Sequence, residues 1–517
     1  MAINYLLGQP RSKRRLFSYS LVTFLALIGF GYLANAIYGN KPRPKLQKID
    51  ALAQHSKIKV YMNHSEANSY TDPYRQIGRA GDDLEQILVD QIKQANSSVD
   101  VAIQEIRLPN LVNALAERKR AGVRVRLVME NSYNLGVKEI YGRLNKMTER
   151  ERKRYKDLIA FADLNNDEQI STDEINQRDA ITMLKNAGIE YIDDTADGSS
   201  GSGLMHHKFV VIDQKKLVTT SANFTLSDMH GDFLAPETRG NSNNMLVIDS
   251  PEVANLFTEE FNLMFRDRLF GTKKPQRLPR TLNLDGATVT VKFSPDRPST
   301  DWQQTSNGLI GASLGKSRTK VDIALFVFAE PFLGNILEQQ QVQVRALVDP
   351  GFAYREYATT LDMWGYVSTQ DCKIGNGKPW QTPIKTAGIP SLPRGDILHH
   401  KYGVVDQKLV ITGSHNWSNS ANTINDETVV IIDSPVVAAH YDREFERLFD
   451  GAVLGPNQKV RDRAQTVCPS NSRQVRKLRR RLGEAGSSSR GRRQGNREQV
   501  IPATESGASE VGERSGI

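Results

Sequence analysis

Two stretches of the chain carry the same reactive side chains at the same spacing. Each has a His, a Lys and an Asp in the pattern His-x-Lys-x4-Asp, followed by a Ser-x-Asn element. The residues are His206, Lys208, Asp213, Ser221 and Asn223 in the first stretch and His399, Lys401, Asp406, Ser414 and Asn416 in the second. Imidazole, fixed positive charge, hydroxyl and amide are what a phosphate diester needs from a nucleophile, a charge clamp and hydrogen-bond donors. The set therefore predicts phosphodiester chemistry.

The segments HHKFVVID and HHKYGVVD have the alternation of buried strands. The His and the Lys of each motif are two positions apart, so both side chains should point to one face of the strand. Asp213 and Asp406 have the opposite parity and come near the strand's end. Packing in the core, rather than chemistry or the lining of a pocket, is the expected role of four neighbouring rings: His207, His400, Trp302 and Trp417.

An internal repeat organises the chain around these motifs. VDVAI from Val99 and VDIAL from Val321 each precede a helical stretch and a second apolar strand, which is the pattern of a βαβ unit. The repeat continues through both motifs to NSNNMLVIDSPEV from Asn241 and INDETVVIIDSPVV from Ile424. We therefore expect an α/β protein of two pseudo-symmetric units, each with a mixed, mostly parallel sheet flanked by helices.

The expected organisation along the chain has seven parts. They are a basic cytoplasmic N-terminus (1–15), an apolar segment (16–38), a linker (39–56), the first unit (57–270), a linker (271–286), the second unit (287–452) and a basic, disordered tail (469–517).

Segment 16–38 has no charged residue, and its length matches the ~20 residues that a helix needs to cross a bilayer. Basic residues before it predict that the rest of the chain lies on the extracytoplasmic side, in a periplasm or outside the cell. The segment is either a membrane anchor or, because Ala34-Asn35-Ala36 resembles a signal-peptidase site, a cleaved signal that would release a secreted protein.

The first unit is longer than the second between equivalent points. Glu130 and His206 are 76 positions apart, whereas Asp349 and His399 are 50 apart. The excess, at about 150–180, contains oxygen-bearing residues at the spacing of an EF-hand calcium loop: Asp163, Asn165, Asp167, Gln169, Ser171 and Glu174. Glu168 replaces the usual glycine. The loop is expected either to hold a structural Ca²⁺ or to have lost its metal.

The paired motifs and their Ser-x-Asn elements resemble the phospholipase D superfamily over some 400 residues. The resemblance implies two halves packed about a pseudo-two-fold axis, with one active site at their interface in a monomer. It also implies a phosphohistidine intermediate and no catalytic cofactor. His206 would be the nucleophile and His399 the acid and base, or the reverse. The phosphate would be held by lysines, serines and asparagines of both motifs: Lys208, Lys401, Ser221, Ser414, Asn223 and Asn416.

The two copies differ in ways that matter under this resemblance. Thr220 stands where the family has the glycine that Gly413 supplies in the second copy, and Asn243 aligns with Glu427. A carboxylate at this place orients a histidine and favours its protonated form. With Glu427 as the single such carboxylate, we expect the two catalytic histidines to be electrically unequal.

Several functions fit this sequence. The net charge of +9 favours an anionic partner. A phospholipase D that hydrolyses or transphosphatidylates phospholipids at a membrane is preferred. The alternative is a nuclease acting on DNA or RNA. A cardiolipin-synthase-type transferase and an inactive binding protein are weaker alternatives. Cys372 and Cys468 are too few for a zinc knuckle and are expected to be two thiols or a single bridge.

Overall fold

A computed structural model describes residues 49–466, apart from 202, 367–368, 371–372 and 375–377. The apolar segment 16–38, the basic tail 469–517, Cys372 and Cys468 lie outside the described residues.

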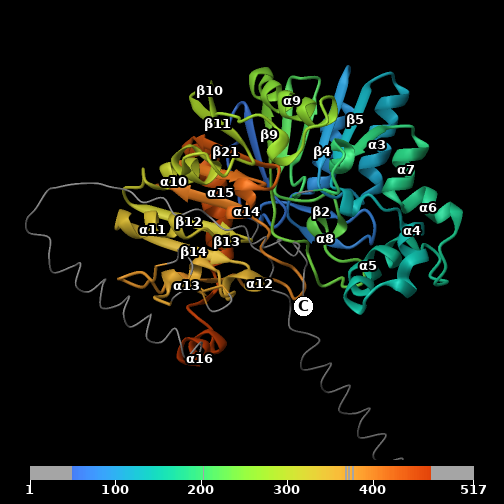
Figure 1. Cartoon of the computed structure of the whole chain (residues 1–517). Helices are drawn as coiled ribbons and strands as arrows, with labels where there is room; N and C mark the ends of the chain where they lie inside the picture. Colours follow the sequence, from blue (N-terminus) through green and yellow to red (C-terminus); the bar gives the residue numbers. More distant parts are fainter. Residues whose placement is uncertain (1–48, 202, 367–368, 371–372, 375–377, 467–517) are drawn as a thin grey trace, which may run out of the picture. The chain divides into compact units, whose positions relative to one another are not determined.

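The first half of the chain forms a seven-stranded sheet (Figure 1). Its strands, in spatial order, are β1 (Ile58–Met62), β9 (Asn244–Asp249), β8 (Lys216–Thr220), β7 (Lys208–Ile212), β4 (Ser98–Ile103), β5 (Arg124–Met129) and β6 (Glu190–Asp193). The central strands β4 and β7 are buried along their whole length. Burial on both faces explains why they read as continuous apolar runs.

The second half repeats this order in a nine-stranded sheet. Its strands are β10 (Arg280–Leu284), β11 (Ala287–Ser294), β21 (Glu427–Asp433), β19 (Leu409–Gly413), β18 (Lys401–Val405), β12 (Lys320–Leu325), β14 (Gln343–Val348), β17 (Ala387–Ile389) and β22 (Val453–Leu454). The two pseudo-symmetric α/β halves predicted from the repeat are thus confirmed.

The prediction that the sheets are mostly parallel was wrong. Parallel pairing joins β4, β5 and β6, and likewise β12, β14 and β17, where helical crossovers connect the strands. The other pairs in both sheets are antiparallel. Short Asp-Gln-Lys turns after β7 and β18 are the physical reason for the β7–β8 and β18–β19 pairs, because each turn reverses the chain directly into a neighbouring strand.

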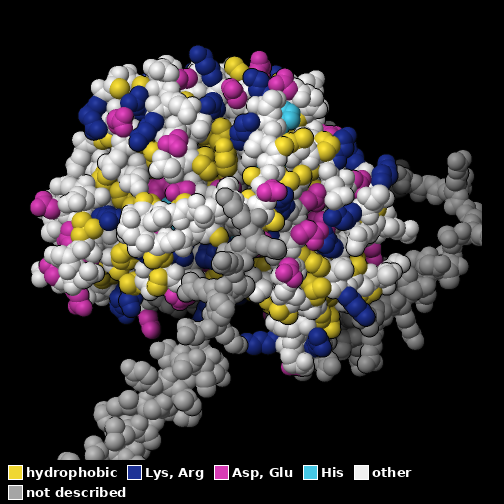
Figure 2. All heavy atoms as spheres, turned by 180° about the vertical axis from the view of Figure 1, so that it is seen from behind, with side chains coloured by type: hydrophobic (Ala, Val, Ile, Leu, Met, Phe, Trp, Pro, Cys, Tyr) yellow, Lys and Arg dark blue, Asp and Glu magenta, His cyan; other side chains and the backbone are white. Residues whose placement is uncertain are grey.

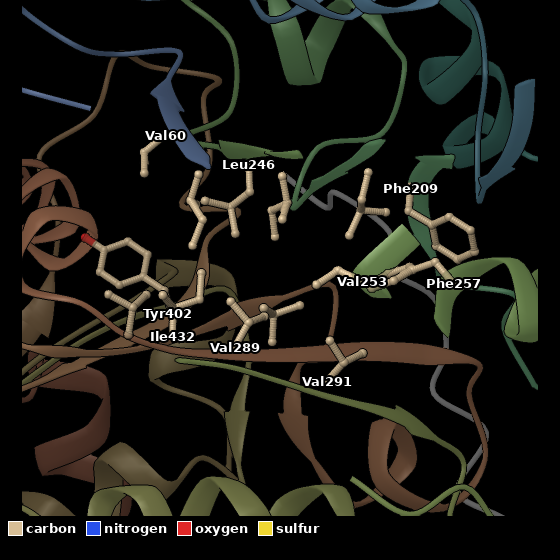
Figure 3. Close-up of a cluster of buried hydrophobic side chains, with 14 of the residues drawn as sticks. Val60, Phe209, Leu246, Val253, Phe257, Val289, Val291, Tyr402 and Ile432 are labelled. Atoms are coloured by element: carbon tan, nitrogen blue, oxygen red, sulfur yellow. The ribbon is translucent and has the colours of Figure 1, made fainter. Parts of the chain in front are cut away.

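Two long helices lie in the layer between the sheets. They are α9 (Pro251–Phe265) and α15 (Pro435–Phe449), each begun by a serine N-cap and a proline at the first position. Both contribute to one apolar cluster that contains residues of the two halves. Figure 3 shows this cluster, with Val60, Phe209, Leu246, Val253 and Phe257 from the first half and Val289, Val291, Tyr402 and Ile432 from the second. This shared core fixes the two motifs relative to each other.

The outer faces of the sheets are covered by further helices with cores of their own. On the first sheet these are α2 (Leu84–Lys93), α3 (Pro109–Arg120) and α7 (Ala180–Asn186). On the second they are α10 (Ser306–Leu314), α11 (Pro331–Gln340) and α13 (Thr359–Met363).

A repeated ion pair marks the symmetry of the halves. Arg126 on β5 contacts Asp100 on β4 at 2.8 Å, and Arg345 on β14 contacts Asp322 on β12 at 2.7 Å. Each guanidinium also lies over phenylalanine rings of α9 or α15, with a shortest distance to a ring centre of 4.9 Å for Arg126 and 4.7 Å for Arg345. Because both acids are buried, these pairs hold the crossover strands against the central helices.

The extra residues of the first half form a helical insertion, at lower right in Figure 1. Its elements are η1 (Asn131–Tyr133), α4 (Val137–Arg143), η2 (Leu144–Lys146), α5 (Glu149–Ala162) and α6 (Thr172–Arg178). The segment after the calcium-like loop divides into α6 and α7 because the Asp179 side chain accepts from the Ile181 N–H and starts a new helix there.

The range 271–286, expected to be a linker, contains η4 (Gly271–Lys273) and strand β10. β10 and β11 form a hairpin closed by Asp285 and Gly286, whose φ angles are 44° and 87°. An Asp-Gly pair of this conformation is a strong hairpin turn, so the second sheet begins within this range.

The remaining described elements are short. They are β2 (Ser69–Thr71), β3 (Gly78–Ala80), η3 (Asp194–Asp197), α8 (Leu226–Met229), η5 (Trp302–Gln304), β13 (Phe328–Ala329), α12 (Pro350–Ala353), β15 (Thr369–Gln370), β16 (Lys373–Ile374), β20 (Trp417–Ser418), α14 (Asn419–Thr423) and α16 (Gln458–Thr466).

Candidate active site

The two motifs are joined by backbone hydrogen bonds between the halves. The N–H of His206 donates to the carbonyl of Asp426 at 3.0 Å, and the N–H of His399 donates to the carbonyl of Ser242 at 3.1 Å. Each bond belongs to a short parallel bridge between a segment of one half and a segment of the other. The backbone of each motif histidine, just before β7 or β18, is therefore fixed by a hydrogen bond to the opposite half.

The imidazole of His206 is held by a carboxylate of the second half. Its Nδ1 lies 2.6 Å from Oε2 of Glu427, and both side chains are fully buried. The hydroxyl of Ser414 donates to the same oxygen at 2.7 Å. Nδ1 therefore donates to Glu427, and Nε2 is the ring nitrogen that would face a phosphorus atom.

His399 has the equivalent arrangement in the other half, with an amide in place of the carboxylate. Its Nδ1 lies 3.0 Å from Oδ1 of Asn243, which also accepts from the Ser221 hydroxyl at 2.8 Å. The Asn243 NH₂ donates to two backbone carbonyls, so its oxygen must face His399. A carboxylate, Asp228, lies farther away, with Oδ1 3.6 Å from Nδ1 of His399. The expected inequality of the two histidines is thus present in their direct partners.

These contacts change the roles expected for two serines. Ser221 and Ser414 were expected to bind the substrate's phosphate, but each hydroxyl donates to the side chain that orients a histidine. Because both hydroxyls are buried against these acceptors, they position the acceptors.

The motif lysines are buried beside the histidines. Lys208 Nζ donates to Gln104 Oε1 at 3.0 Å and to the carbonyl of His206. Lys401 Nζ donates to the carbonyl of His399 at 2.9 Å and lies 4.8 Å from the ring centre of Phe326. Gln104 and Phe326 follow β4 and β12 at equivalent positions. Lys208 therefore contacts a side-chain amide, and Lys401 contacts an aromatic ring.

Asp213 and Asp406, expected to be catalytic, are not brought to the histidines. Asp213 accepts from the backbone of residues 96–98, where β4 begins, and Asp406 accepts from residues 318–320, where β12 begins. Burial would raise the pKa of each, but these N–H donors outweigh it and lower both pKa values. The physical reason is position: four residues of strand separate each Asp from its Lys, so the carboxylates anchor turns at the opposite strand end.

A cavity of about 180 Å³ opens beside His399. Asn223 lines it, and the buried Oδ1 of this side chain has no hydrogen-bond partner in the part of the chain that the structure describes. One wall comes from the insertion, through Tyr155, Leu158 and Phe161 of α5. The insertion thus forms part of the wall of the cavity beside His399.

Glu130 and Asp349, for which the sequence predicted no role in the site, also support the motifs. Glu130 accepts from the N–H of Met205 at 2.8 Å, and Asp349 accepts from the N–H of Leu398 at 3.0 Å. Burial raises the pKa of Glu130, and it raises that of Asp349 to about 6. Both acids follow equivalent strands of the repeat, which is the signal that could have identified them.

His207, His400 and Trp417 are buried in the core as expected, whereas Trp302 is only partly buried. His207 is fully buried and contacts Thr428 and, at 3.3 Å, Glu260 of α9, while His400 contacts Glu444 of α15 at 3.1 Å. Trp417 is buried against Phe328. Trp302 packs on Phe332. None of these four side chains lines the described cavity.

The Gly413 and Thr220 positions differ for a steric reason. Gly413 has φ of +129°, and a Cβ there would lie 2.2 Å from the carbonyl oxygen of Thr428. Thr220 has no such left-handed backbone, and its hydroxyl donates to the carbonyl of Asn244 at 2.6 Å. The departure from the family pattern therefore leaves the strand intact.

The calcium-like loop is closed by its own hydrogen bonds. Glu174 accepts from the N–H groups of Leu164 at 2.8 Å and Ser171 at 2.8 Å, and it completes a capping box on α6. Asp163 accepts from the N–H of Glu168 at 3.0 Å. Across the described residues, no group of three or more His, Cys, Asp or Glu side chains is arranged to hold a metal. These bonds hold the Asp163 and Glu174 side chains against the backbone of the loop.

The two-part pattern of the fold corresponds to a family model. The model described as "Cardiolipin synthase, PLD-like domain" matches residues 88–265 and 310–449, which is more than half of the chain. The chain therefore belongs to this PLD-like family.

Curated relatives match a smaller part of the chain. A mitochondrial cardiolipin hydrolase of Xenopus laevis is 30% identical over 142 residues, covering 26% of this chain and 57% of that protein. One of Chlamydomonas reinhardtii is 36% identical over 143 residues, covering 26% of this chain and 54% of that protein. The chain thus spans about half the length of these relatives.

A solved structure, phosphatidylserine synthase of Haemophilus influenzae Rd KW20, has a TM-score of 0.50 and 11% identity, with 84% of this chain and 95% of that chain covered. This likeness concerns the fold alone.

The extracytoplasmic localisation predicted from the sequence is contradicted. Over residues 49–466, with their gaps, the structure has no helix long and apolar enough to cross a membrane. The curated relatives are named mitochondrial proteins, not extracytoplasmic or secreted ones. The segment on which the prediction depended, 16–38, lies outside the described residues.

Proposed function

We propose that this protein is a phosphodiesterase of the phospholipase D type, which cleaves phospholipids through a phosphohistidine. The observation that carries the proposal is the pair of motif imidazoles, each with Nδ1 held by a side chain of the opposite half. Fixing Nδ1 as a donor directs Nε2 to chemistry. Two histidines prepared in this way suit a reaction in two displacements.

His206 is the proposed nucleophile. Its Nε2 bonds to phosphorus while the bond to the leaving alcohol's oxygen breaks, and His399 gives its proton to that oxygen. Water then attacks phosphorus, the phosphorus–nitrogen bond breaks, and the proton of the water passes to His399. A phosphorylated imidazole that keeps its Nδ1 proton is cationic, and Glu427, in contact with His206, would stabilise it.

The names of the curated relatives support a lipid rather than a nucleic-acid substrate, since they are cardiolipin hydrolases. One face of the molecule adds little in favour of nucleic acid (Figure 2). On the face seen in Figure 2, the described Lys and Arg side chains are interspersed with Asp and Glu and do not form a basic stripe. Hydrolysis and transfer share the same first displacement, so transphosphatidylation remains part of the proposal.

The test is turnover by the full chain on vesicles of phosphatidylcholine, phosphatidylglycerol or cardiolipin, with single-stranded DNA in parallel. Ethanol in the assay would be incorporated as phosphatidylethanol if the enzyme transfers. His206→Ala and His399→Ala should each lower turnover about 10³-fold or more, because the first variant loses the nucleophile and the second loses the proton donor. His440→Ala, a histidine outside the site, is the matched control. Cleavage of DNA with no lipid product would refute the lipid proposal.

A further inference from the structure

His399 has a carboxylate nearby that does not come from the position aligned with Glu427. Asp228, on α8 of the first half, has its Oδ1 3.6 Å from Nδ1 of His399. The Asp228 side chain is 5% exposed and that of His399 is 4% exposed, so water screens their interaction little. In the aligned second copy, the equivalent residue is Ala421, which has no charge.

The Asp228 carboxylate is fixed in this place. Oδ2 accepts from the N–H of Asn223 at 2.7 Å, and Oδ1 accepts from the side-chain amide of Asn241 at 2.7 Å. Asn243, which contacts His399 directly, donates to the Asp228 carbonyl at 3.1 Å. Asp228 therefore fixes both the orientation of the amide partner and the position of a negative charge behind it.

The charges around His399 show why such a carboxylate is needed. Burial raises the pKa of Asp228, and the hydrogen bonds from Asn241 and Asn223 and the charges of Lys401 and Lys208 oppose that rise. Lys401 also donates to the His399 carbonyl, and the ring of Phe326 packs against the imidazole at 5.0 Å. Glu105, Arg107 and Asp157 line the same cavity, and Glu105 and Arg107 pair with each other. Two lysines and a neutral amide would disfavour protonation of His399.

We propose that Asp228 is a positioning residue that keeps His399 protonated, and so able to donate to the leaving alcohol, in place of the carboxylate that Asn243 lacks. This inference rests on the proposed function, in which His399 is the acid. Each imidazole then has one acid of its own. His206 contacts Glu427 directly, and His399 has Asp228 behind Asn243.

The test compares the full chain with Asp228→Asn, which is isosteric and removes the charge. A carboxylate at this distance shifts a partner's pKa by about 1 unit or more. The basic limb of the kcat profile should therefore move down by about 1 pH unit, and kcat at pH 8 should fall about tenfold with KM little changed. NMR of the His399 ring, assigned with His399→Gln, should show the same downward shift in its titration.

Two further variants separate charge from structure. Asp179→Asn changes another buried carboxylate that caps a helix, away from the site, and should leave the His399 titration unchanged. Asp228→Asn combined with Asn243→Asp puts a carboxylate in direct contact with Nδ1 and should restore the basic limb. An unchanged His399 titration in Asp228→Asn, or a failure of the double variant to restore it, would overturn the inference. If the wild-type chain cleaves no lipid, the proposed function fails, while the NMR titration still decides whether Asp228 charges His399.

Discussion

Replacing Glu427 by Gln tests whether the cross-half carboxylate drives catalysis. The substitution keeps the size and an oxygen acceptor, so His206 Nδ1 and the Ser414 hydroxyl retain a partner. It removes the negative charge that lies 2.6 Å from the ring nitrogen in a fully buried pair. Glu427→Gln and the wild-type chain therefore differ chiefly in the charge beside His206.

The size of the effect follows from Coulomb's law. Opposite charges about 4 Å apart attract by about 4 kcal/mol at an effective dielectric constant of about 20. If the phosphohistidine step depends on this attraction, its rate falls about 10³-fold, since each ~1.4 kcal/mol is a factor of ten. Ser414→Ala, which removes one neutral hydrogen bond to the same oxygen, should cost about tenfold or less.

The assay is single-turnover formation of the acid-labile phosphoenzyme from a labelled lipid, followed by its hydrolysis. Thermal melting checks that Glu427→Gln is folded. A folded Glu427→Gln protein that forms phosphoenzyme within fivefold of the wild-type rate would refute the reasoning, because the charge would then contribute almost nothing.

Three other outcomes are expected. Asp213→Asn should lower the free energy of unfolding by about 1–2 kcal/mol in urea at pH 7. Because folding lowers the pKa of Asp213, the stabilisation by this carboxylate exists above about pH 4 and disappears as pH falls through the folded pKa. If Asp213→Asn lowers the free energy of unfolding at pH 2.5 by as much as at pH 7, the prediction is contradicted. Burial lowers the pKa of His415 to about 4, so this residue should contribute about 3 kcal/mol to the loss of stability of the wild-type chain as pH falls from about 6.5 to 4, and His415→Asn should reduce the loss by that amount. Millimolar Ca²⁺ should raise the melting temperature if the loop at 163–174 binds it, Asp163→Ala should abolish the rise, and an unchanged wild-type melting temperature would mean that the loop closes without metal.

The repeat made the strands predictable because local apolar runs and their order are written in the sequence. VDVAI and VDIAL became β4 and β12 with the same parallel neighbours. The direction of strand pairing could not be predicted in the same way. The Asp-Gln-Lys turns after β7 and β18 reverse the chain, but their sequence is not one of the familiar two-residue hairpin signals. The Asp285-Gly286 turn did carry one, and it placed β10 in the expected linker.

The site was predictable in composition and less so in geometry. Spacing alone identified both histidines and lysines, which the structure buries together with their acceptors. It placed Asp213 and Asp406 near the strand's end, but it could not show that each carboxylate binds the backbone where β4 or β12 begins, because those contacts join residues 116 and 87 positions apart. Nor could it show Asp228, whose proximity to His399 arises only when the two halves meet.

The two halves share a scaffold and differ where charge is placed. The bridges that seat His206 and His399 are equivalent, and so are the serines behind their acceptors. Against this common frame, one acceptor is a carboxylate and the other an amide. Packing constrains the frame because a change there disturbs both sheets, whereas exchanging Glu for Asn at one acceptor alters a single ring's proton affinity. A duplicated unit can therefore divide nucleophile and acid between its copies without changing its fold.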